Sequence, residues 1–374
     1  MDQGLVSCQT SIIQGRNEFS PGLVRLKKQH LDRRLFPTTR YYGSKLRLVE
    51  WLSDSLRDLH FHTVLDAFGG TGTVSLLFKM MEKDVTYNDA LWSNYHIATA
   101  VLSPSNSALR SKDLHNFPAT VCPKIGYIAN TFKDIYYTEQ ENRWLDGAVS
   151  SINRKLDPQF RSDLFYSLFQ ACLQKRPFNI FHRKNLYLRK NCDQRTAFGN
   201  WKTWERTFEE LMRRASLELE RARSVKSGST TVLIPTDASK ISNNYDLVYL
   251  DPPYLKQQKN ELNYEGRYHF LEGLARYDEW EYLIDTSKNN LAFKGSSAVE
   301  EWNSKKYFKD RLFDLVTKHR RSIVVLSYAE NGYPEVSEIL GHFKSEFKNV
   351  MVVRQNLSHA LSKNKSTELL IVGA

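Results

Sequence analysis

The segment Tyr245-Asp246-Leu247-Val248-Tyr249-Leu250-Asp251-Pro252-Pro253-Tyr254 decides the fold of this chain. Residues 245–250 are rich in β-forming side chains and predict a short buried strand. Each of the two prolines fixes its own φ and lacks an N–H, so the strand ladder must end there. The strand therefore runs into a stiff loop that presents a carboxylate, bare carbonyl groups and an aromatic ring. In open α/β sheets, ligands bind outside the carboxyl ends of the strands.

This loop, residues 251–254, suits the activation of an exocyclic amine on a nucleobase. The lone pair of such an amine is delocalised into the ring, and acceptors aimed at its N–H hydrogens free that lone pair for attack. The Asp251 carboxylate and the Pro252 carbonyl could be these acceptors, and the Tyr254 ring could stack on the base. A base in a duplex reaches the loop only after flipping out of the stack. The alternative is a strand end closed by a Pro252-Pro253 turn, with Asp251 as a cap.

Composition bounds the class of protein. The chain has 374 residues, of which 41% are hydrophobic and 25% charged, so we expect one large domain with an insertion, or two domains. Lys and Arg outnumber Asp and Glu by 53 to 42, and the net charge of +11 favours polyanionic partners. Residues 1–40 are polar and basic, without a signal-peptide core, and no apolar run reaches membrane length.

The cysteines indicate a reducing compartment. They stand at Cys8, Cys122, Cys172 and Cys192, and no pair has the spacing of metal ligands. We expect reduced thiols in a cytosolic protein and no metal site.

A glycine motif, Asp66-Ala67-Phe68-Gly69-Gly70-Thr71-Gly72, separates an expected strand at 62–67 from an expected helix. Strand, glycine turn and helix form the first half of a nucleotide-type βαβ unit. Ser75 replaces the third glycine of a dinucleotide fingerprint, so the ligand is expected to lack a pyrophosphate, as S-adenosylmethionine does. Asp66 is placed to pair with the ammonium group of that cofactor. The alternative is a turn that only packs helix on strand.

Two charged residues flank this motif. Lys45 follows Ser44, the expected cap of a helix with an apolar stripe at Leu46, Val49, Leu52, Leu56 and Leu59. A lysine beside a helix start opposes the macrodipole, so it indicates either an anionic ligand or a surface side chain. Asp89 ends the strand expected at 84–88, about 20 positions after the glycine turn, where a ribose diol is bound. The alternative for Asp89 is the cap of a helix at 90–101.

Residues 103–229 interrupt the pattern and are expected to be helical and basic. Two apolar helix faces are expected, one at Leu164, Phe165, Leu168, Phe169, Cys172 and Leu173, the other at Trp201, Trp204, Phe208 and Leu211. Residues 175–190 lie between these faces and combine basic, amide and aromatic side chains, which suit phosphates and base edges. The expected nucleic-acid contacts are Arg176, Arg183, Lys184, Asn185 and Arg189. The alternative is a charged loop over a helical subdomain.

The whole chain predicts a mostly parallel sheet. Seven strands are expected, at 62–67, 84–88, 231–235, 245–250, 322–327, 349–355 and 367–372. Helices or insertions separate most of them, as parallel strands require, whereas the last two are close enough for an antiparallel pair. Residues 261–274 show little periodicity and are expected to form a loop that closes over a substrate.

These motifs together resemble the Dam-like, D12 class of adenine-N6 DNA methyltransferases over about residues 38–374. The order is part of the resemblance, because the lysine turn at 41–45 precedes the glycine motif and the insertion precedes the 251–254 loop. The segments that carry it are Tyr41 to Lys45, Asp66 to Gly72, Asn88-Asp89, Asp237-Ala238, Asp251 to Tyr254, Ser327-Tyr328 and Glu368 to Val372.

The resemblance implies an α/β, Rossmann-like S-adenosylmethionine-dependent methyltransferase fold with a helical target-recognition insertion. It implies a basic N-terminal extension at 1–36, a catalytic domain at 37–102 and 230–374, and a DNA-binding target-recognition domain at 103–229. It places Tyr41 and Lys45 at the methionine end of the cofactor, Asp89 at the ribose and Asp237 near the adenine. The full set of implied cofactor contacts is Tyr41, Gly43, Lys45, Asp66, Phe68, Gly70, Gly72, Asp89, Asp237 and Asp251.

The expected activity is transfer of a methyl group from S-adenosylmethionine to N6 of a flipped adenine in duplex DNA, with Asp251, Pro252, Pro253 and Tyr254 as the catalytic residues. The alternatives are the same chemistry on cytosine N4 or on RNA, and a silent DNA-binding subunit. A dehydrogenase is disfavoured, because the third glycine is missing. The sequence does not decide between two biological roles: marking DNA as a solitary enzyme, or protecting DNA from a partner restriction endonuclease. A cytoplasmic, nucleoid-associated monomer is the default expectation.

Overall fold

The computed structural model describes residues 31–38, 43–103, 108–178, 180–192, 201–225, 228–242, 244–257, 264–295, 297–359 and 362–374. Its centre is a seven-stranded sheet with the strand order β3-β2-β1-β4-β6-β9-β8. The strands are β1 (Thr63–Asp66), β2 (Asp84–Tyr87), β3 (Thr230–Val232), β4 (Leu247–Leu250), β6 (Ile323–Ala329), β8 (Val350–His359) and β9 (Ser362–Gly373). All seven expected strands are thereby confirmed, with ends that differ by a few residues.

The pairing explains where a ligand can bind. The first five strands in this order pair in parallel, and β9 runs antiparallel between β6 and β8, as expected for the last two strands. The chain moves outward from β1 to β2 and β3, then returns to place β4 on the other side of β1. The glycine motif after β1 and the 251–254 loop after β4 therefore leave the same edge at a topological switch point, where α/β sheets bind ligands.

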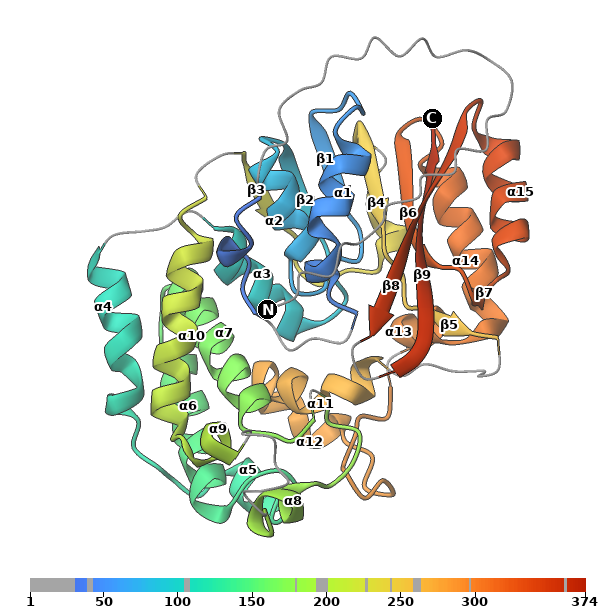
Figure 1. The fold of residues 1–374 in the computed structure, drawn as a ribbon. Helices are drawn as coiled ribbons and strands as arrows, with labels where there is room; N and C mark the ends of the chain where they lie inside the picture. The colour runs from blue at the N-terminus through green and yellow to red at the C-terminus, as the bar shows by residue number, and fades with distance from the viewer. Residues whose placement is uncertain are drawn as a thin grey trace.

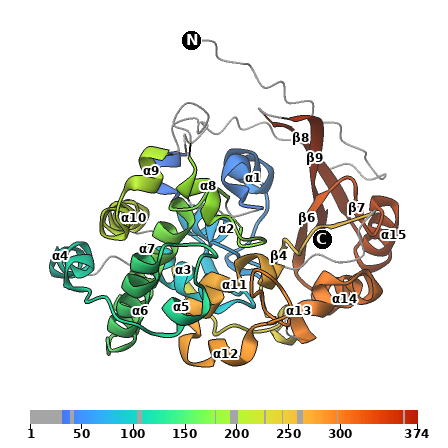
Figure 2. The same cartoon turned by 90° about the horizontal axis from the view of Figure 1, so that it is seen from below.

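Helices cover both faces of the sheet (Figures 1 and 2). One face carries α1 (Val49–Leu56), α2 (Thr73–Met80) and α3 (Trp92–Leu102); the other carries α13 (Ser297–Asn303), α14 (Lys305–Lys318) and α15 (Val336–Glu346). Along β4, Leu247 and Tyr249 join the first core, whereas Val248 and Leu250 join the second. A strand buried on both faces reads as a continuous apolar run, which explains residues 247–250.

Local sequence explains the turns at this edge of the sheet. The Ser44 hydroxyl accepts a hydrogen bond from the Leu46 amide at 3.4 Å and opens a 3-10 turn, η2 (Lys45–Leu48), that continues into α1. Gly72 has φ +74° at the start of α2, a conformation that side-chain-bearing residues rarely adopt. A Cβ on Gly69 would lie 2.2 Å from the Tyr87 ring, so the turn also needs glycine there.

A helical body lies beside the sheet, at the lower left of Figure 1. Its helices are α4 (Ala108–Asn116), α5 (Tyr127–Thr131), α6 (Glu139–Asn153), α7 (Pro158–Gln174), α8 (Leu186–Lys190), α9 (Trp201–Glu205), α10 (Phe208–Ala222), α11 (Tyr264–Ala275) and α12 (Trp280–Leu283). The apolar face expected on residues 164–173 is confirmed, since all six of its residues are buried in α7. In the second face, Phe208 and Leu211 are buried, whereas Trp201 and Trp204 are only half-buried.

The loop expected at 261–274 is wrong for the part that the structure describes, which is helix α11. Apolar Phe270 and Leu271 and polar His269 and Glu272 of this helix are all buried. A helix buried on nearly every side shows no amphipathic period, and this hid it in the sequence. The Phe181 amide donates to the Arg267 carbonyl at 2.7 Å, so α11 joins the helical body although it follows the 251–254 loop in the chain.

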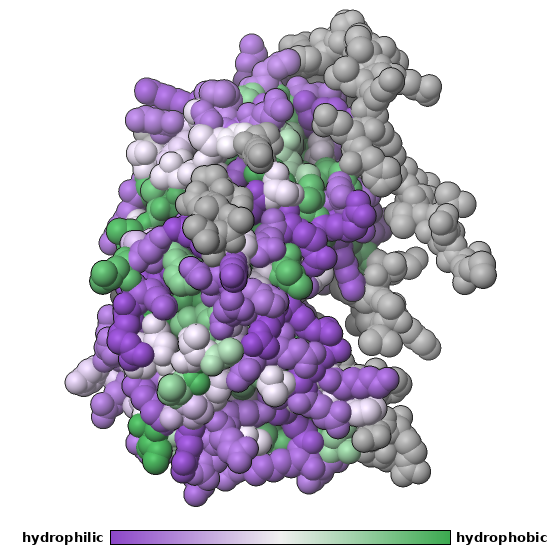
Figure 3. Space-filling view, turned by 90° about the vertical axis from the view of Figure 1, so that its left-hand side faces the viewer, coloured by the Kyte–Doolittle hydropathy of each residue, from purple (hydrophilic) through white to green (hydrophobic). Residues whose placement is uncertain are grey.

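The described residues before β1 pack on the fold, and the surface of the helical body is mainly polar. Within the residues predicted as an N-terminal extension, Phe36 is buried in the main core, so the described residues 31–38 pack on the fold. Figure 3 shows that the face over the helical body is mainly hydrophilic, with apolar residues in small separate spots. Within the described residues, no helix combines the length and apolar character that crossing a membrane requires.

Candidate active site

A cavity of about 840 Å³ lies where β1 and β4 end, and it brings together motifs that are far apart in the chain. The expected site residues that line it are Gly43, Lys45, Asp66, Phe68, Gly70, Asp89, Asp251, Pro252, Pro253 and Tyr254. Gly72 is not among the lining residues and instead caps α2 behind the turn. Tyr41 lies outside the described residues.

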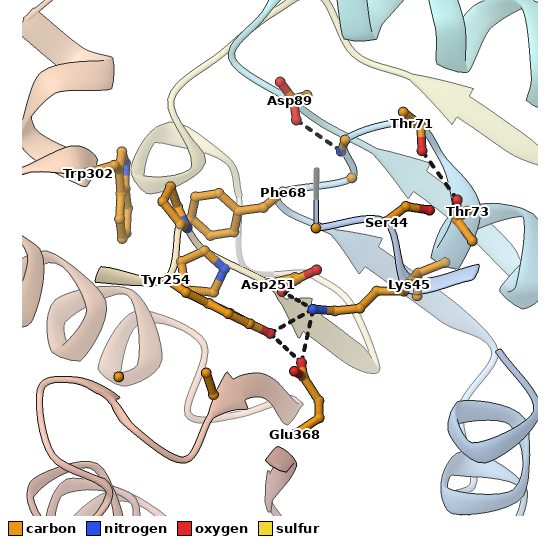
Figure 4. A pocket seen from close by; sticks show the side chains of 18 of the residues that line it. Ser44, Lys45, Phe68, Thr71, Thr73, Asp89, Asp251, Tyr254, Trp302 and Glu368 are labelled. Carbon is orange, nitrogen blue, oxygen red and sulfur yellow. Dashed lines mark hydrogen bonds and ion pairs between the residues drawn. The ribbon is translucent and has the colours of Figure 1, made fainter. Parts of the chain in front are cut away.

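Lys45 occupies the centre of a buried group of charges at one wall of the cavity (Figure 4). Its Nζ lies 2.9 Å from Asp251 Oδ1, 2.9 Å from Glu368 Oε1 and 2.7 Å from the Tyr254 hydroxyl. A lysine ammonium has three N–H donors, so all three have acceptors. The surface-lysine alternative is therefore wrong, and protein carboxylates balance this charge. We call Lys45, Asp251, Tyr254, Ser327 and Glu368 the Lys45 network.

Titration in this network follows from burial and charge. Burial disfavours the ammonium form of Lys45, but the carboxylates of Asp251 and Glu368 outweigh burial and raise the Lys45 pKa. Burial raises the pKa of Asp251 against the pull of Lys45. Burial, with the two carboxylates, also raises the pKa of Tyr254 well above its usual range. Tyr254 is therefore a neutral phenol, which accepts from Lys45 and donates to Glu368.

The Tyr254 ring is held at both its edge and its face. Its hydroxyl lies 3.1 Å from Ser327 Oγ as well as bonding to Lys45 and Glu368. Lys45 Nζ lies 4.5 Å from the ring centroid, and the Tyr328 ring packs at a centroid distance of 5.9 Å. The predicted stacking of a base on Tyr254 would therefore use a ring whose plane is already set.

Asp66 lies at the other wall, at the start of the glycine motif. The Ser75 hydroxyl donates to its Oδ2 at 2.6 Å, whereas Oδ1 is buried and has no hydrogen-bond partner among the described residues. Burial raises the Asp66 pKa to about 7, with Ser75 acting in the opposite direction and Asp251 and Asp89 adding to the rise. A buried acceptor without a donor is unusual and suits a donating ligand, so the site fits a bound ammonium group.

Asp89 ties the glycine motif to the next helix. Its Oδ2 accepts from the Gly70 amide at 2.9 Å, and its Oδ1 accepts from the Leu91 amide at 2.9 Å, just before α3 begins. The capping alternative is wrong, because the N-cap of α3 is Leu91, without a side-chain cap bond. The Trp92 and Ser93 amides donate to Glu272 instead. Burial raises its pKa, and the ribose contact stays a prediction.

Asp237 lies in a smaller adjoining cavity of about 150 Å³ rather than in the main one. Its Oδ1 accepts from Trp302 Nε1 and from the Ser239 amide, both at 3.1 Å, and its Oδ2 pairs with Arg311. Asp237 thus holds Trp302, which lines both cavities and whose ring meets Phe68 edge-on at a centroid distance of 4.9 Å. Both Asp237 oxygens already have protein partners, and the implied contact of Asp237 with an adenine stays a prediction.

Sequence reasoning assigned no role to Glu368, Ser327, Trp302 or Tyr328. One signal for Glu368 was present, since a lone acidic residue opens the otherwise apolar run Leu369 to Val372 of a buried strand. An unpaired carboxylate is strongly unfavourable at such a position, so the sequence indicates that donors or a cation face it. Nothing in the local sequence around Trp302 distinguishes it from a core tryptophan.

The expected nucleic-acid residues divide into two groups. Arg183 and Lys184 are exposed before α8. Arg176 and Asn185 are fully buried, and the Arg189 side chain is 9% exposed and bonds Glu141 at 2.7 Å. The expected direct contacts of Arg176 and Asn185 are therefore wrong in this conformation, because the sequence pattern counts charges and amides without their burial.

Comparison with known proteins agrees with this geometry. A family model described as the D12 class N6 adenine-specific DNA methyltransferase matches residues 41–326. The type II methyltransferase M2.HphI of Haemophilus parahaemolyticus is 24% identical over 90% of this chain and 97% of its own length. The type II methyltransferase M.NlaIII of Neisseria lactamica is 23% identical over 80% of this chain and 86% of its own length. The matched motifs and their convergence on one cavity lead to a single conclusion: the chain belongs to the D12 class of N6 adenine-specific DNA methyltransferases.

Proposed function

We propose that this DNA methyltransferase takes its methyl group from S-adenosylmethionine and delivers it to N6 of an adenine flipped out of duplex DNA. One observation carries the proposal: the Asp251 carboxylate and the glycine motif line the same cavity of about 840 Å³. A cavity of that size is within the range of small-molecule and cofactor sites.

The cofactor, when bound, would supply a methyl group activated by a sulfonium. The residues that would hold it are those of the glycine-motif wall. Asp66 offers its unpartnered buried Oδ1 to the ammonium group, and Asp89 and Gly70 lie where the ribose is expected. Phe68 and Trp302 line both cavities and offer apolar surface for the adenine ring.

The 251–254 loop would orient the target amine. Asp251 Oδ1 is held by Lys45, and the Pro252 carbonyl comes from the next residue along a rigid loop. These two acceptors take the two N–H hydrogens, and the nitrogen lone pair then points at the methyl group. Asp251, whose pKa burial raises, accepts the proton that the amine loses once it is methylated. Much of the rate comes from positioning and from exclusion of water.

We further propose that residues 103–229 recognise the DNA target, while the sheet and its flanking helices within 37–102 and 230–374 carry the chemistry. Exposed Arg183 and Lys184, beside exposed Tyr187, would contact phosphates. The similarity to type II methyltransferases favours a role as the modification arm of a restriction–modification system, paired with an endonuclease.

Sequencing that reports modified bases tests the reaction directly. DNA from cells that express the chain is compared with DNA from cells that express Asp251→Ala, a variant that keeps the glycine motif intact. We expect N6-methyladenine at one short motif, and none in the variant. Methylated cytosine instead of adenine, or equal methylation by Asp251→Ala, would overturn the proposal.

A further inference from the structure

Glu368 is a carboxylate placed where the fold offers it almost no water. It lies on β9, opposite Ala329 of β6 and Gln355 of β8, and its side chain is 7% exposed. The residues that follow it in the strand, Leu369 to Val372, are buried and apolar. An ionised side chain at such a position needs close partners, because burial of an unpaired charge is strongly unfavourable.

Three donors converge on a single oxygen of Glu368. Its Oε1 lies 2.9 Å from Lys45 Nζ and accepts from the Tyr254 hydroxyl (Figure 4). The same oxygen lies 2.7 Å from Ser327 Oγ. These donors come from η2, from β6 and from the loop after β4. One carboxylate thus joins three segments that contact one another at the edge of the cavity.

The geometry points to Glu368 as a positioning residue, which sets the Tyr254 ring and, through Lys45, the Asp251 carboxylate for methyl transfer. This inference rests on the proposed function. Tyr254 accepts from Lys45 and donates to Glu368, so the two bonds fix the phenol oxygen and with it the direction of the ring on which a base would stack. Asp251 Oδ1 bonds the same ammonium at 2.9 Å, so a shift of Lys45 moves the acceptor of the target amine.

Charge balance gives Glu368 a second effect. With Asp251 as its only partner, Lys45 would stabilise the ionised Asp251 carboxylate with its full charge. The Glu368 carboxylate also pairs with this ammonium, and its negative charge raises the pKa of Asp251. Removal of that charge is therefore expected to lower the Asp251 pKa and to extend activity to lower pH.

The test uses Glu368→Gln, which keeps the shape of the side chain, beside Glu346→Gln on α15, outside the cavity. Single-turnover methyl transfer, S-adenosylmethionine affinity and the pH profile are measured for both and for the wild type. We expect Glu368→Gln to lower the transfer rate about 100-fold, in keeping with lost charge-assisted hydrogen bonds. We expect its cofactor affinity to stay within about twofold, and the acid limb of its profile to shift to lower pH. Glu346→Gln should match the wild type.

A double-mutant cycle with Tyr254→Phe separates positioning from general damage to the fold. If Glu368 acts through Tyr254, the combined variant loses little more activity than the worse single variant. In duplexes with 2-aminopurine at the target position, Glu368→Gln should raise the fluorescence of the bound base, because a mobile ring stacks less.

A transfer rate and pH profile for Glu368→Gln equal to those of Glu346→Gln would overturn the inference, as would fully additive losses in the cycle. Absence of adenine methylation by the wild-type protein would overturn the proposed function and this inference with it, so the two failures are distinct.

Discussion

Two buried cations, Lys45 and Arg176, have opposite surroundings in this protein. Lys45 contacts two carboxylates and a phenol, and each of its N–H groups has an acceptor. Arg176 lies with its guanidinium carbon 3.7 Å from the Phe181 ring centroid and 4.6 Å from that of Tyr136. None of its three nitrogens has a hydrogen-bond partner within the described part of the chain. Lys45 therefore holds its place by ion pairing, whereas Arg176 holds its place by packing against aromatic faces.

The difference teaches where this fold needs fixed geometry. Ion pairs and hydrogen bonds have direction, so the Lys45 network sets the angles of Asp251 and Tyr254. Stacking between rings tolerates rotation, and it fills the helical body without fixing a polar group. Removal of the Lys45 charge should therefore destabilise the protein strongly, whereas removal of the Arg176 charge should change its stability little.

The largest effect is expected for Lys45→Met. The substitution leaves Asp251 and Glu368 buried beside each other without a cation, and breaking a buried pair in this way costs about 3–5 kcal/mol. Urea denaturation at pH 7 should show this loss of unfolding free energy, together with loss of methyl transfer. A change below about 1 kcal/mol would mean that the carboxylates do not depend on Lys45.

Asp66→Asn extends the comparison to a buried carboxyl group, one oxygen of which has no hydrogen-bond partner among the described residues. The Asp66 pKa is about 7 in the folded protein against 3.8 for the ordinary side chain, so the protonated form stabilises the fold. Its contribution is present below about pH 4 and is lost as the pH rises through 7. The asparagine variant should therefore be more stable than the wild type at pH 8 by a few kcal/mol, since one pKa unit corresponds to about 1.4 kcal/mol.

Thermal melts of Asp66→Asn and wild type at pH 4.5 and pH 8 measure this difference. The advantage of the variant should be small at the lower pH. An advantage of equal size at both values would mean that Asp66 ionises normally in the fold. S-adenosylmethionine at saturating concentration should reduce the advantage at pH 8, because its ammonium would pair with the ionised wild-type carboxylate.

Arg176→Met should have a much smaller effect, because no carboxylate of the described residues pairs with Arg176. Replacement of a buried charge by an apolar side chain of similar volume is often neutral or stabilising. We expect the unfolding free energy to change by less than about 1.5 kcal/mol. A loss as large as that of Lys45→Met would instead reveal an anionic partner for Arg176.

The smallest effect on stability is expected for Arg183→Ala and Lys184→Ala, which are exposed. Each should change the unfolding free energy by no more than about 0.5 kcal/mol. Each should also reduce the slope of log affinity for DNA against log salt concentration by about 1. Salt titrations by fluorescence anisotropy measure that slope. Unchanged slopes would mean that Arg183 and Lys184 do not contact phosphates and that another surface does.

The sequence predicts the sheet and one wall of the site well, for a physical reason. Local sequence predicts the buried strands that end at Gly69-Gly70 or at Pro252-Pro253, because the residues that end a strand lie next to it in the chain. Glu368 was named only as part of a motif, because its partners lie in distant segments. Helix α11 was hidden by burial on all sides, and the buried state of Arg176 is a property of packing that composition does not carry.

The position of β9 has a consequence for protein synthesis. A chain that grows on the ribosome releases Lys45, the glycine motif and the 251–254 loop long before Glu368. Until β9 inserts beside β6, that strand has an open edge, and Lys45 faces Asp251 without the second carboxylate. The nascent protein can thus build its cofactor wall early and its Lys45 network only late. If Glu368 positions Tyr254 and Asp251 as we propose, we expect methyl transfer only after translation has passed residue 368.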